Sequence, residues 1–263
     1  MIYTYSYTEP IGDGVDIYIV DSGVYTEHSE FERRAIFGWA AEGLDRTDDN
    51  GHGTYVAGIA AGRVFGVAKK ANIIAVKVLD HERLGRKDDI IDGLSWVSTN
   101  VRSTGRPSIA CVCINGPHME AVDDAANALI KSGVTLVVSA GNTSEDARNT
   151  SPASAIHAIV VGASNISNNK RWNSNFGPAV DVFAPGEDIR AAWVDGPRST
   201  NQLNGTSAAT AHVAGIAANF LSIDPRMTPS AIGTKIWLLQ TEDAISDVPP
   251  GTTTDFVFNG GSQ

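Results

Sequence analysis

The 263-residue sequence has little cysteine, no excess of basic residues and no long apolar run, and each lack narrows the possible functions. Its 20 lysines and arginines are outnumbered by 30 aspartates and glutamates, which gives a formal net charge of -10. No positive charge is left in excess to neutralise phosphates, so we expect no nucleic-acid partner. No apolar stretch approaches the roughly twenty residues that cross a bilayer, so we expect no membrane partner.

The only cysteines are Cys111 and Cys113, two residues apart in an apolar run. Side chains on one face of a strand point in parallel, which is poor geometry for a disulfide. Two thiols are also too few for a structural zinc site. We therefore expect both to be buried as small hydrophobic side chains.

Apolar runs rich in β-branched residues alternate with helical patterns along the chain. The runs cover residues 15–20, 73–78, 109–114, 134–138 and 158–161, and the clearest helical stretches are 88–99 and 121–132. This alternation predicts βαβ units, and therefore an α/β three-layer sandwich with a mostly parallel central sheet. No linker divides residues 1–263, so we expect a single domain with its site at the carboxyl ends of the strands.

Three separate blocks carry residues suited to attack on an amide bond. Asp21 directly follows the first apolar run, His52 lies among glycines, and Ser207 follows Gly205-Thr206 ahead of a segment rich in alanine. Amide hydrolysis needs an activated nucleophile, a base for its proton and donors for the oxyanion. A serine at a helix N-terminus has unpaired backbone amides beside it, so the amide of Ser207 is a candidate donor.

The blocks follow the chain order Asp, His, Ser and resemble the signatures of the subtilisin-like serine peptidases, most closely the proteinase K subfamily. The resemblance covers nearly the whole chain, without the N-terminal residues of the family domain and without a pro-segment. It implies a serine endopeptidase in which Asp21, His52 and Ser207 form the triad. Asn142 then supplies a side-chain donor to the oxyanion hole.

The resemblance also implies partners and a substrate cleft. The partners are protein or peptide substrates, and a pro-segment or protein inhibitor. Substrate would lie as an added strand between two segments, with a third forming a wall of the main specificity pocket. The matching residues are Leu84, Gly85 and Arg86, then Ile114, Asn115 and Gly116, and for the wall Ser139, Ala140 and Gly141.

Four positions depart from the family pattern. Tyr55 stands where a second histidine is usual, Ala208 where methionine is usual, and Ala211 where proline is usual. Asn115 replaces a glycine beside the substrate, where glycine allows a close approach. The competing hypothesis is therefore a catalytically silent peptide-binding module that kept the cleft. A serine esterase of the α/β-hydrolase type is disfavoured, because no Gly-x-Ser-x-Gly surrounds Ser207.

No cofactor is expected for catalysis, but the resemblance implies a structural calcium ion. Asp181 matches a carboxylate ligand of the family, with backbone carbonyls of Ile156 and Ala158 beside it. The acidic pairs lack the spacing of a calcium loop and are expected to form solvated surface. They are Asp48-Asp49, Asp88-Asp89 and Asp123-Asp124. The remaining histidines are expected to be structural: His28, His81, His118, His157 and His212.

The location is open from the sequence. The family resemblance favours secretion. The N-terminal Met1-Ile2-Tyr3-Thr4 lacks the features of a signal peptide, and the sparse cysteine gives no disulfide pattern, so an intracellular role stays possible.

Overall fold

The computed structural model describes residues 11–260 and is built on a seven-stranded sheet with the order β2-β3-β1-β4-β6-β8-β9. Every neighbouring pair in this sheet is parallel. The strands are β1 (Asp16–Asp21), β2 (Ala35–Ala40), β3 (Asn72–Lys77), β4 (Ser108–Val112), β6 (Thr135–Ser139), β8 (Ile159–Ser164) and β9 (Val182–Pro185). The residues Met1 to Thr4, on which the signal-peptide argument depends, lie outside the described part.

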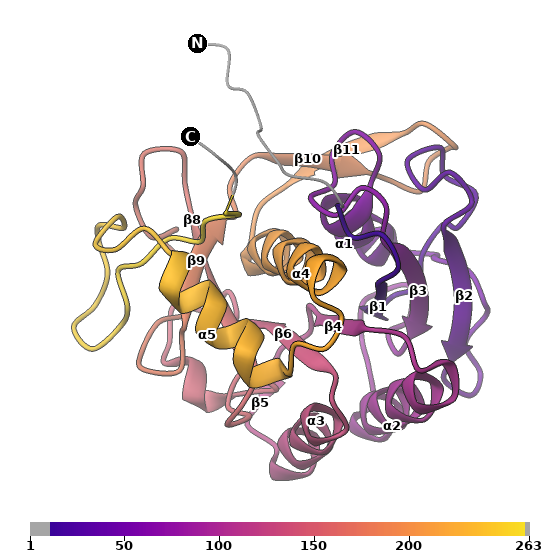
Figure 1. Cartoon of the computed structure of the whole chain (residues 1–263), viewed down its shortest axis with the longest axis horizontal. Coiled ribbons are helices and arrows are strands. Elements are labelled where there is room, and N and C mark those ends of the chain that lie inside the picture. Colours follow the sequence, from indigo (N-terminus) through magenta and orange to yellow (C-terminus); the bar gives the residue numbers. More distant parts are fainter. Residues whose placement is uncertain (1–10, 261–263) are drawn as a thin grey trace.

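Helices cover both faces of the sheet (Figure 1). The helices are α1 (His52–Ala61), α2 (Lys87–Thr104), α3 (Glu120–Lys131), α4 (Thr206–Ile223) and α5 (Pro229–Leu239). One buried cluster contains residues of α1, α4 and α5, and the other contains residues of α2 and α3. The expected α/β three-layer sandwich with a parallel sheet is therefore confirmed.

The central strands are hydrophobic on both faces because helices cover both faces. All residues of β1, β4 and β6 are buried, as the continuous apolar runs predict. Val20 lies in register with Val76 of β3 and Val112 of β4, so neighbouring strands end at the same edge. The loops that follow them meet there, and this edge carries the residues discussed below.

Several elements were not predicted. The edge strand β2 has one buried residue and a β-bulge, and Gly38 interrupts its apolar residues. Two short antiparallel pairs lie outside the sheet: β5 (Gly116–Pro117) with β7 (Thr150–Ser151), and β10 (Ile189–Ala192) with β11 (Thr200–Leu203). None of the helices within residues 11–260 combines the length and apolarity needed to cross a membrane.

Candidate active site

The predicted base lies where β1 ends and α1 begins. Asp21 is the last residue of β1, and both of its carboxylate oxygens lie 2.8 Å from Nδ1 of His52, the first residue of α1. Asp21 is completely buried and His52 is 4% exposed. This contact favours the tautomer with a proton on Nδ1, which leaves Nε2 to accept a proton from a nucleophile.

The carboxylate of Asp48 fixes the beginning of α1. Its Oδ1 accepts from the amide of Gly51 at 2.8 Å and from the hydroxyl of Ser22 at 2.9 Å. Its Oδ2 accepts from the amide and the hydroxyl of Thr54 at 2.9 and 2.5 Å. One side chain thus joins the residue after the end of β1 to the first turn of the helix that carries His52.

The prediction of a solvated surface for the acidic pairs is wrong at Asp48 and Asp123. Asp48 makes the contacts just described, and Asp123 is 7% exposed. Asp49 is exposed as predicted, and its carboxylate also lies 2.5 Å from Nζ of Lys77, a fully buried lysine on β3. Calcium-loop spacing does not reveal the role of Asp48, because a carboxylate a few residues before a helix start is instead a capping signal. The pair members that are exposed as predicted include Asp88 and Asp124.

Ser207 lies in the first turn of α4 at the same edge of the sheet. The preceding Gly205 has φ 143°, which favours glycine, and a Cβ there would lie 3.2 Å from Oδ1 of Asn142. Cys113, which follows β4, has its Sγ 3.5 Å from the carbonyl oxygen of Ser207. Because β4 pairs with β1, this contact places Ser207 beside the strand that ends in Asp21.

The hydroxyl of Ser207 and Nε2 of His52 form no hydrogen bond in the part of the chain that the structure describes. The structure therefore brings Asp21 to His52 and places Ser207 at the same edge, without a formed contact between nucleophile and base. Catalytic contacts are often long or poorly aligned before substrate binds.

Asn142 is held against the beginning of α4. Its Oδ1 accepts from the amide of Thr206 at 2.9 Å, which fixes the rotation of the side-chain amide. The amide of Ser207 has no acceptor within residues 11–260, so it remains a free donor in the first turn of the helix. The Nδ2 group of Asn142 and this backbone amide are the two donors that an oxyanion would need.

The predicted cleft residues follow three neighbouring strands. Leu84 and Gly85 follow β3 and are exposed, and Ile114 to Gly116 follow β4. The strand β1, with Asp21 at its end, lies between β3 and β4. Ser139, Ala140 and Gly141 end or follow β6, and all three are buried.

The side chain of Asn115 forms hydrogen bonds from the segment after β4 to the end of β6. Its Nδ2 donates to the carbonyl oxygen of Ser139 at 2.7 Å, and its Oδ1 accepts from the hydroxyl of Ser139 at 2.5 Å. The residue that replaces glycine in the predicted substrate strand is therefore bonded to the predicted pocket wall. We call this pair of hydrogen bonds the Asn115–Ser139 clasp.

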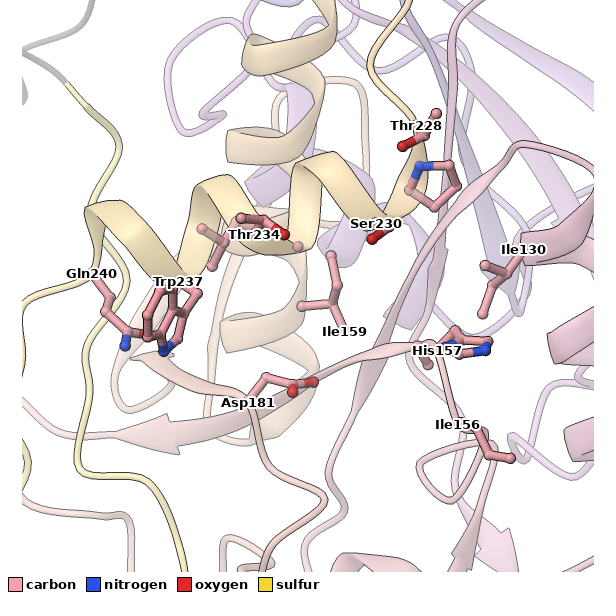
Figure 2. Close-up of a pocket in the computed structure, with 14 residues that line it drawn as sticks. Ile130, Ile156, His157, Ile159, Asp181, Thr228, Ser230, Thr234, Trp237 and Gln240 are labelled. Carbon is pink, nitrogen blue, oxygen red and sulfur yellow. The ribbon is translucent and has the colours of Figure 1, made fainter.

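A hollow of about 510 Å³ lies beside α5, and Asp181 forms part of its lining (Figure 2). Ile156 and Ala158, the residues expected to offer carbonyl ligands, line the same hollow. Much of the surface of Asp181 is exposed, but its carboxyl group is desolvated, which raises the pKa of Asp181 to about 6. Its Oδ2 accepts from the amide of Val160 at 2.8 Å, and no ion pair within residues 11–260 involves it.

A second group of serine, histidine and aspartate lies outside the site. His118 has Nδ1 3.0 Å from the hydroxyl of Ser154 and 3.3 Å from Asp123. Ser154 lies 2.6 Å from Asp123 and donates to it directly. The imidazole is therefore not between the other two, and this group lacks the arrangement of a nucleophile and base.

The other histidines either contact backbone carbonyl oxygens or are exposed. His28 has Nε2 2.9 Å from the carbonyl oxygen of Ser199, and His81 is exposed. His212 on α4 has Nδ1 2.8 Å from the carbonyl oxygen of Ala208, and desolvation lowers its pKa to about 4. His157 is exposed at the hollow beside α5.

Both cysteines are free and buried, as expected. Their sulfurs lie 3.8 Å apart, and burial raises the pKa of the Cys113 thiol. The Cys113 thiol therefore stays protonated and packs against the carbonyl oxygen of Ser207, and Cys111 packs beside it.

Comparisons with known proteins give a consistent match. Residues 12–256 match the family model described as "Subtilase family". The chain is 42% identical over 260 residues to "Subtilisin-like protease 2" of Pseudogymnoascus destructans, and the alignment covers 98% of this chain and 64% of that protein. It is 40% identical over 259 residues to "Cuticle-degrading protease" of Metarhizium anisopliae, and the alignment covers 98% of this chain and 66% of that protein.

A solved structure described as a "cold adapted subtilisin-like serine proteinase" superimposes with a TM-score of 0.91 at 36% identity. The match covers 97% of this chain and 92% of that one. By contrast, the chain spans slightly less than two thirds of the length of the two curated relatives.

Proposed function

The chain belongs to the subtilase family, and from that premise we propose that it is a serine endopeptidase acting through Asp21, His52 and Ser207. The observation that carries the proposal is the buried contact of Asp21 with His52, at the sheet edge where the amide of Ser207 is open. A binding module would not need a desolvated pair of this kind.

In the proposed reaction, Oγ of Ser207 attacks the carbonyl carbon of the scissile peptide bond, and Nε2 of His52 takes the hydroxyl proton. Asp21 accepts from Nδ1 and stabilises the imidazolium that forms. The carbonyl oxygen becomes an oxyanion, held by the amide of Ser207 and by Nδ2 of Asn142. His52 then gives its proton to the leaving amine, and an acyl-enzyme remains.

Water completes the cycle in the reverse sense. His52 takes a proton from the water molecule, the resulting hydroxide attacks the acyl carbonyl, and Oγ of Ser207 leaves with the proton. Because the base must be neutral to accept the hydroxyl proton, activity is expected to be lost in acid, where the imidazole is protonated.

A fluorophosphonate probe tests the proposal. We expect it to label the wild type at Ser207 and to leave Ser207→Ala unlabelled. Ser103→Ala is the matched control, because Ser103 is an exposed serine on α2, and this variant should label like the wild type. Folded protein that is labelled in none of the three would instead favour the silent peptide-binding module.

The proposed partners are protein or peptide substrates, and a pro-segment or protein inhibitor that occupies the cleft. One relative is named as a cuticle-degrading protease, which favours protein substrates outside the cell and a secreted enzyme. Cleavage of denatured casein by medium from cells secreting the chain tests both points. Activity confined to the cell lysate would contradict secretion.

A structural calcium ion in the hollow beside α5 is the second part of the proposal. Carboxylate and carbonyl oxygens are the ligands that calcium prefers, and Asp181, Ile156 and Ala158 line one cavity. A raised pKa means that the ionised carboxylate is disfavoured in the folded chain, and a bound cation would reverse this. We expect chelator above pH about 6 to lower the melting temperature of wild type, and calcium to restore it.

Asp181→Asn is the matched variant for this test, because it keeps the size of the side chain and removes its charge. Its melting temperature should respond little to chelator. The calcium site is ruled out if chelator leaves the wild-type melting temperature unchanged.

A further inference from the structure

The Asn115–Ser139 clasp lies between the two segments that flank the first turn of α4. β4 and β6 are neighbouring parallel strands, and Cys111 of β4 lies in register with Val137 of β6. The chain after β4 contacts Ser207 through Cys113, and the chain after β6 runs to Asn142, which bonds to α4. Any group that enters between these two segments next to Ser207 must therefore pass the clasp.

The proposed reaction identifies this group as the side chain of the substrate residue that precedes the scissile bond. When a carbonyl carbon meets Oγ of Ser207 and its oxygen points to Nδ2 of Asn142, the residue that carries this carbonyl lies against these segments. Its side chain then projects toward the space between residues 114–116 and 139–141. In this structure the side-chain amide of Asn115 spans that space and bonds to Ser139.

From this placement we propose that the Asn115–Ser139 clasp determines specificity, and that the enzyme cleaves after small residues such as alanine, glycine and serine. The inference rests on the proposed function and names the substrate class of the same site. A methyl group or a hydrogen needs no space beyond the clasp. A phenylalanine or leucine side chain has to displace the amide of Asn115.

Displacing the clasp is costly because of what it leaves behind. Ser139 is completely buried, and its hydroxyl and carbonyl oxygen would both lose their bond to Asn115. Buried polar groups without a partner are strongly disfavoured. A large substrate side chain therefore has to compete with two hydrogen bonds.

The wall on the Ser139 side cannot move away to make room. Ala140 donates its amide to the carbonyl oxygen of Val161 on β8, and its own carbonyl oxygen accepts from Nδ2 of Asn175 at 2.8 Å. Asn175 is completely buried and also accepts from the amide of Thr143. Because this wall is held from behind, the adjustable part of the pocket is Asn115.

The test measures cleavage of two peptides that differ only in having alanine or phenylalanine before the scissile bond. The wild type should favour alanine in kcat/KM. Asn115→Gly should shift the alanine-to-phenylalanine ratio toward phenylalanine by about 10- to 100-fold. Ser139→Ala removes one of the two hydrogen bonds and should shift the ratio in the same direction by less. An unchanged ratio in Asn115→Gly, or a wild type that already favours phenylalanine, overturns the proposal.

The same variants separate this inference from the proposed function. The fluorophosphonate probe carries no substrate side chain, so labelling of the wild type or of Asn115→Gly reports a reactive Ser207 whatever the peptide preference. If it labels neither, binding of the two peptides to Ser207→Ala and to the Ser207→Ala, Asn115→Gly double variant decides. A preference for alanine that is lost in the double variant supports the clasp, and equal binding in both refutes it.

Discussion

The helices that carry the proposed base and the proposed nucleophile begin differently. At the start of α1, the amides of His52, Gly53 and Thr54 all have side-chain acceptors, from Asn50, Ser22 and Asp48 in that order. At the start of α4, the amide of Thr206 bonds to Asn142 and the amide of Ser207 is open.

This difference separates two uses of a helix N-terminus. Unpaired amides and the helix dipole favour a negative charge there. In α1 the negative charge is internal, because the carboxylate of Asp48 supplies it, and the result is a fixed position for His52. In α4 the amide of Ser207 is unpaired, and in the proposed reaction it would meet a charge that arises only during catalysis. We therefore expect changes at α1 to lower stability and changes at the beginning of α4 to lower the rate.

The largest effect is expected at the beginning of α4, from replacing Asn142 by aspartate. Aspartate keeps an oxygen for the amide of Thr206 and removes the Nδ2 donor. We expect kcat to fall by at least about 10²- to 10³-fold, which is about 3 to 4 kcal/mol of transition-state stabilisation, with KM little changed. Steady-state kinetics together with thermal melting check this. A fall in kcat of less than tenfold would show that Asn142 is only structural.

The next effect is expected at α1, from replacing Asp48 by alanine. Its partners at Ser22, Gly51 and Thr54 would lose their acceptor, which should lower the free energy of unfolding by about 3 kcal/mol. Urea denaturation measures this loss. Asp124→Ala is the matched control, since Asp124 is an exposed aspartate, and it should change stability by about 0.5 kcal/mol or less. Equal losses of unfolding free energy in the two variants would contradict the stabilising role of Asp48 at the beginning of α1.

A smaller, pH-dependent effect is expected from His212 on α4. Its pKa is lowered to about 4 in the folded chain, so between that value and the ordinary value the unfolded chain binds more protons. Stability should therefore fall as pH falls through this window, by about 2 kcal/mol between about pH 7 and about pH 4.5.

The contribution of His212 is isolated by comparison with His212→Gln, which removes the titrating group. Thermal melting at several pH values should show that the stability difference between wild type and this variant shifts in favour of the variant as pH falls. A difference that stays constant with pH would contradict the assignment to His212.

The smallest effect is expected from Tyr55→Phe on α1. The hydroxyl of Tyr55 donates to the carbonyl oxygen of Ile189 at 2.8 Å and ties α1 to the β10–β11 pair. Its loss should cost about 1 kcal/mol of stability and leave kcat unchanged. Urea denaturation and steady-state kinetics measure the two quantities, and a large fall in kcat would show that the anchoring of α1 also matters for the rate.

The sequence predicted the elements whose environment is uniform along their length. The strands β1, β4 and β6 are buried throughout, so their apolar runs identified them. Gly38 interrupts the apolar residues of the edge strand β2, and β9 has only four residues, so each apolar stretch is too short to be identified as a strand.

At the site, motif order singled out Asp21, His52 and Ser207, while the residues that position them were missed. Asp48 was interpreted as surface charge, because its contacts depend on how the loop before α1 turns toward Ser22. Asn115 was recognised as unusual, but its partner Ser139 lies 24 residues away on another strand end. Such contacts depend on which strands are neighbours in the sheet, and local sequence patterns do not predict the order of the strands.

The thiols of Cys111 and Cys113 give the protein a built-in reporter of opening motions. They are buried below Ser207, and no other cysteine is present, so a maleimide can react only when the core at this place opens. The labelling rate in the folded protein then measures how often the floor of the site is exposed to solvent. Because the reporter needs no added label site, it can be read in every variant discussed above without further mutation.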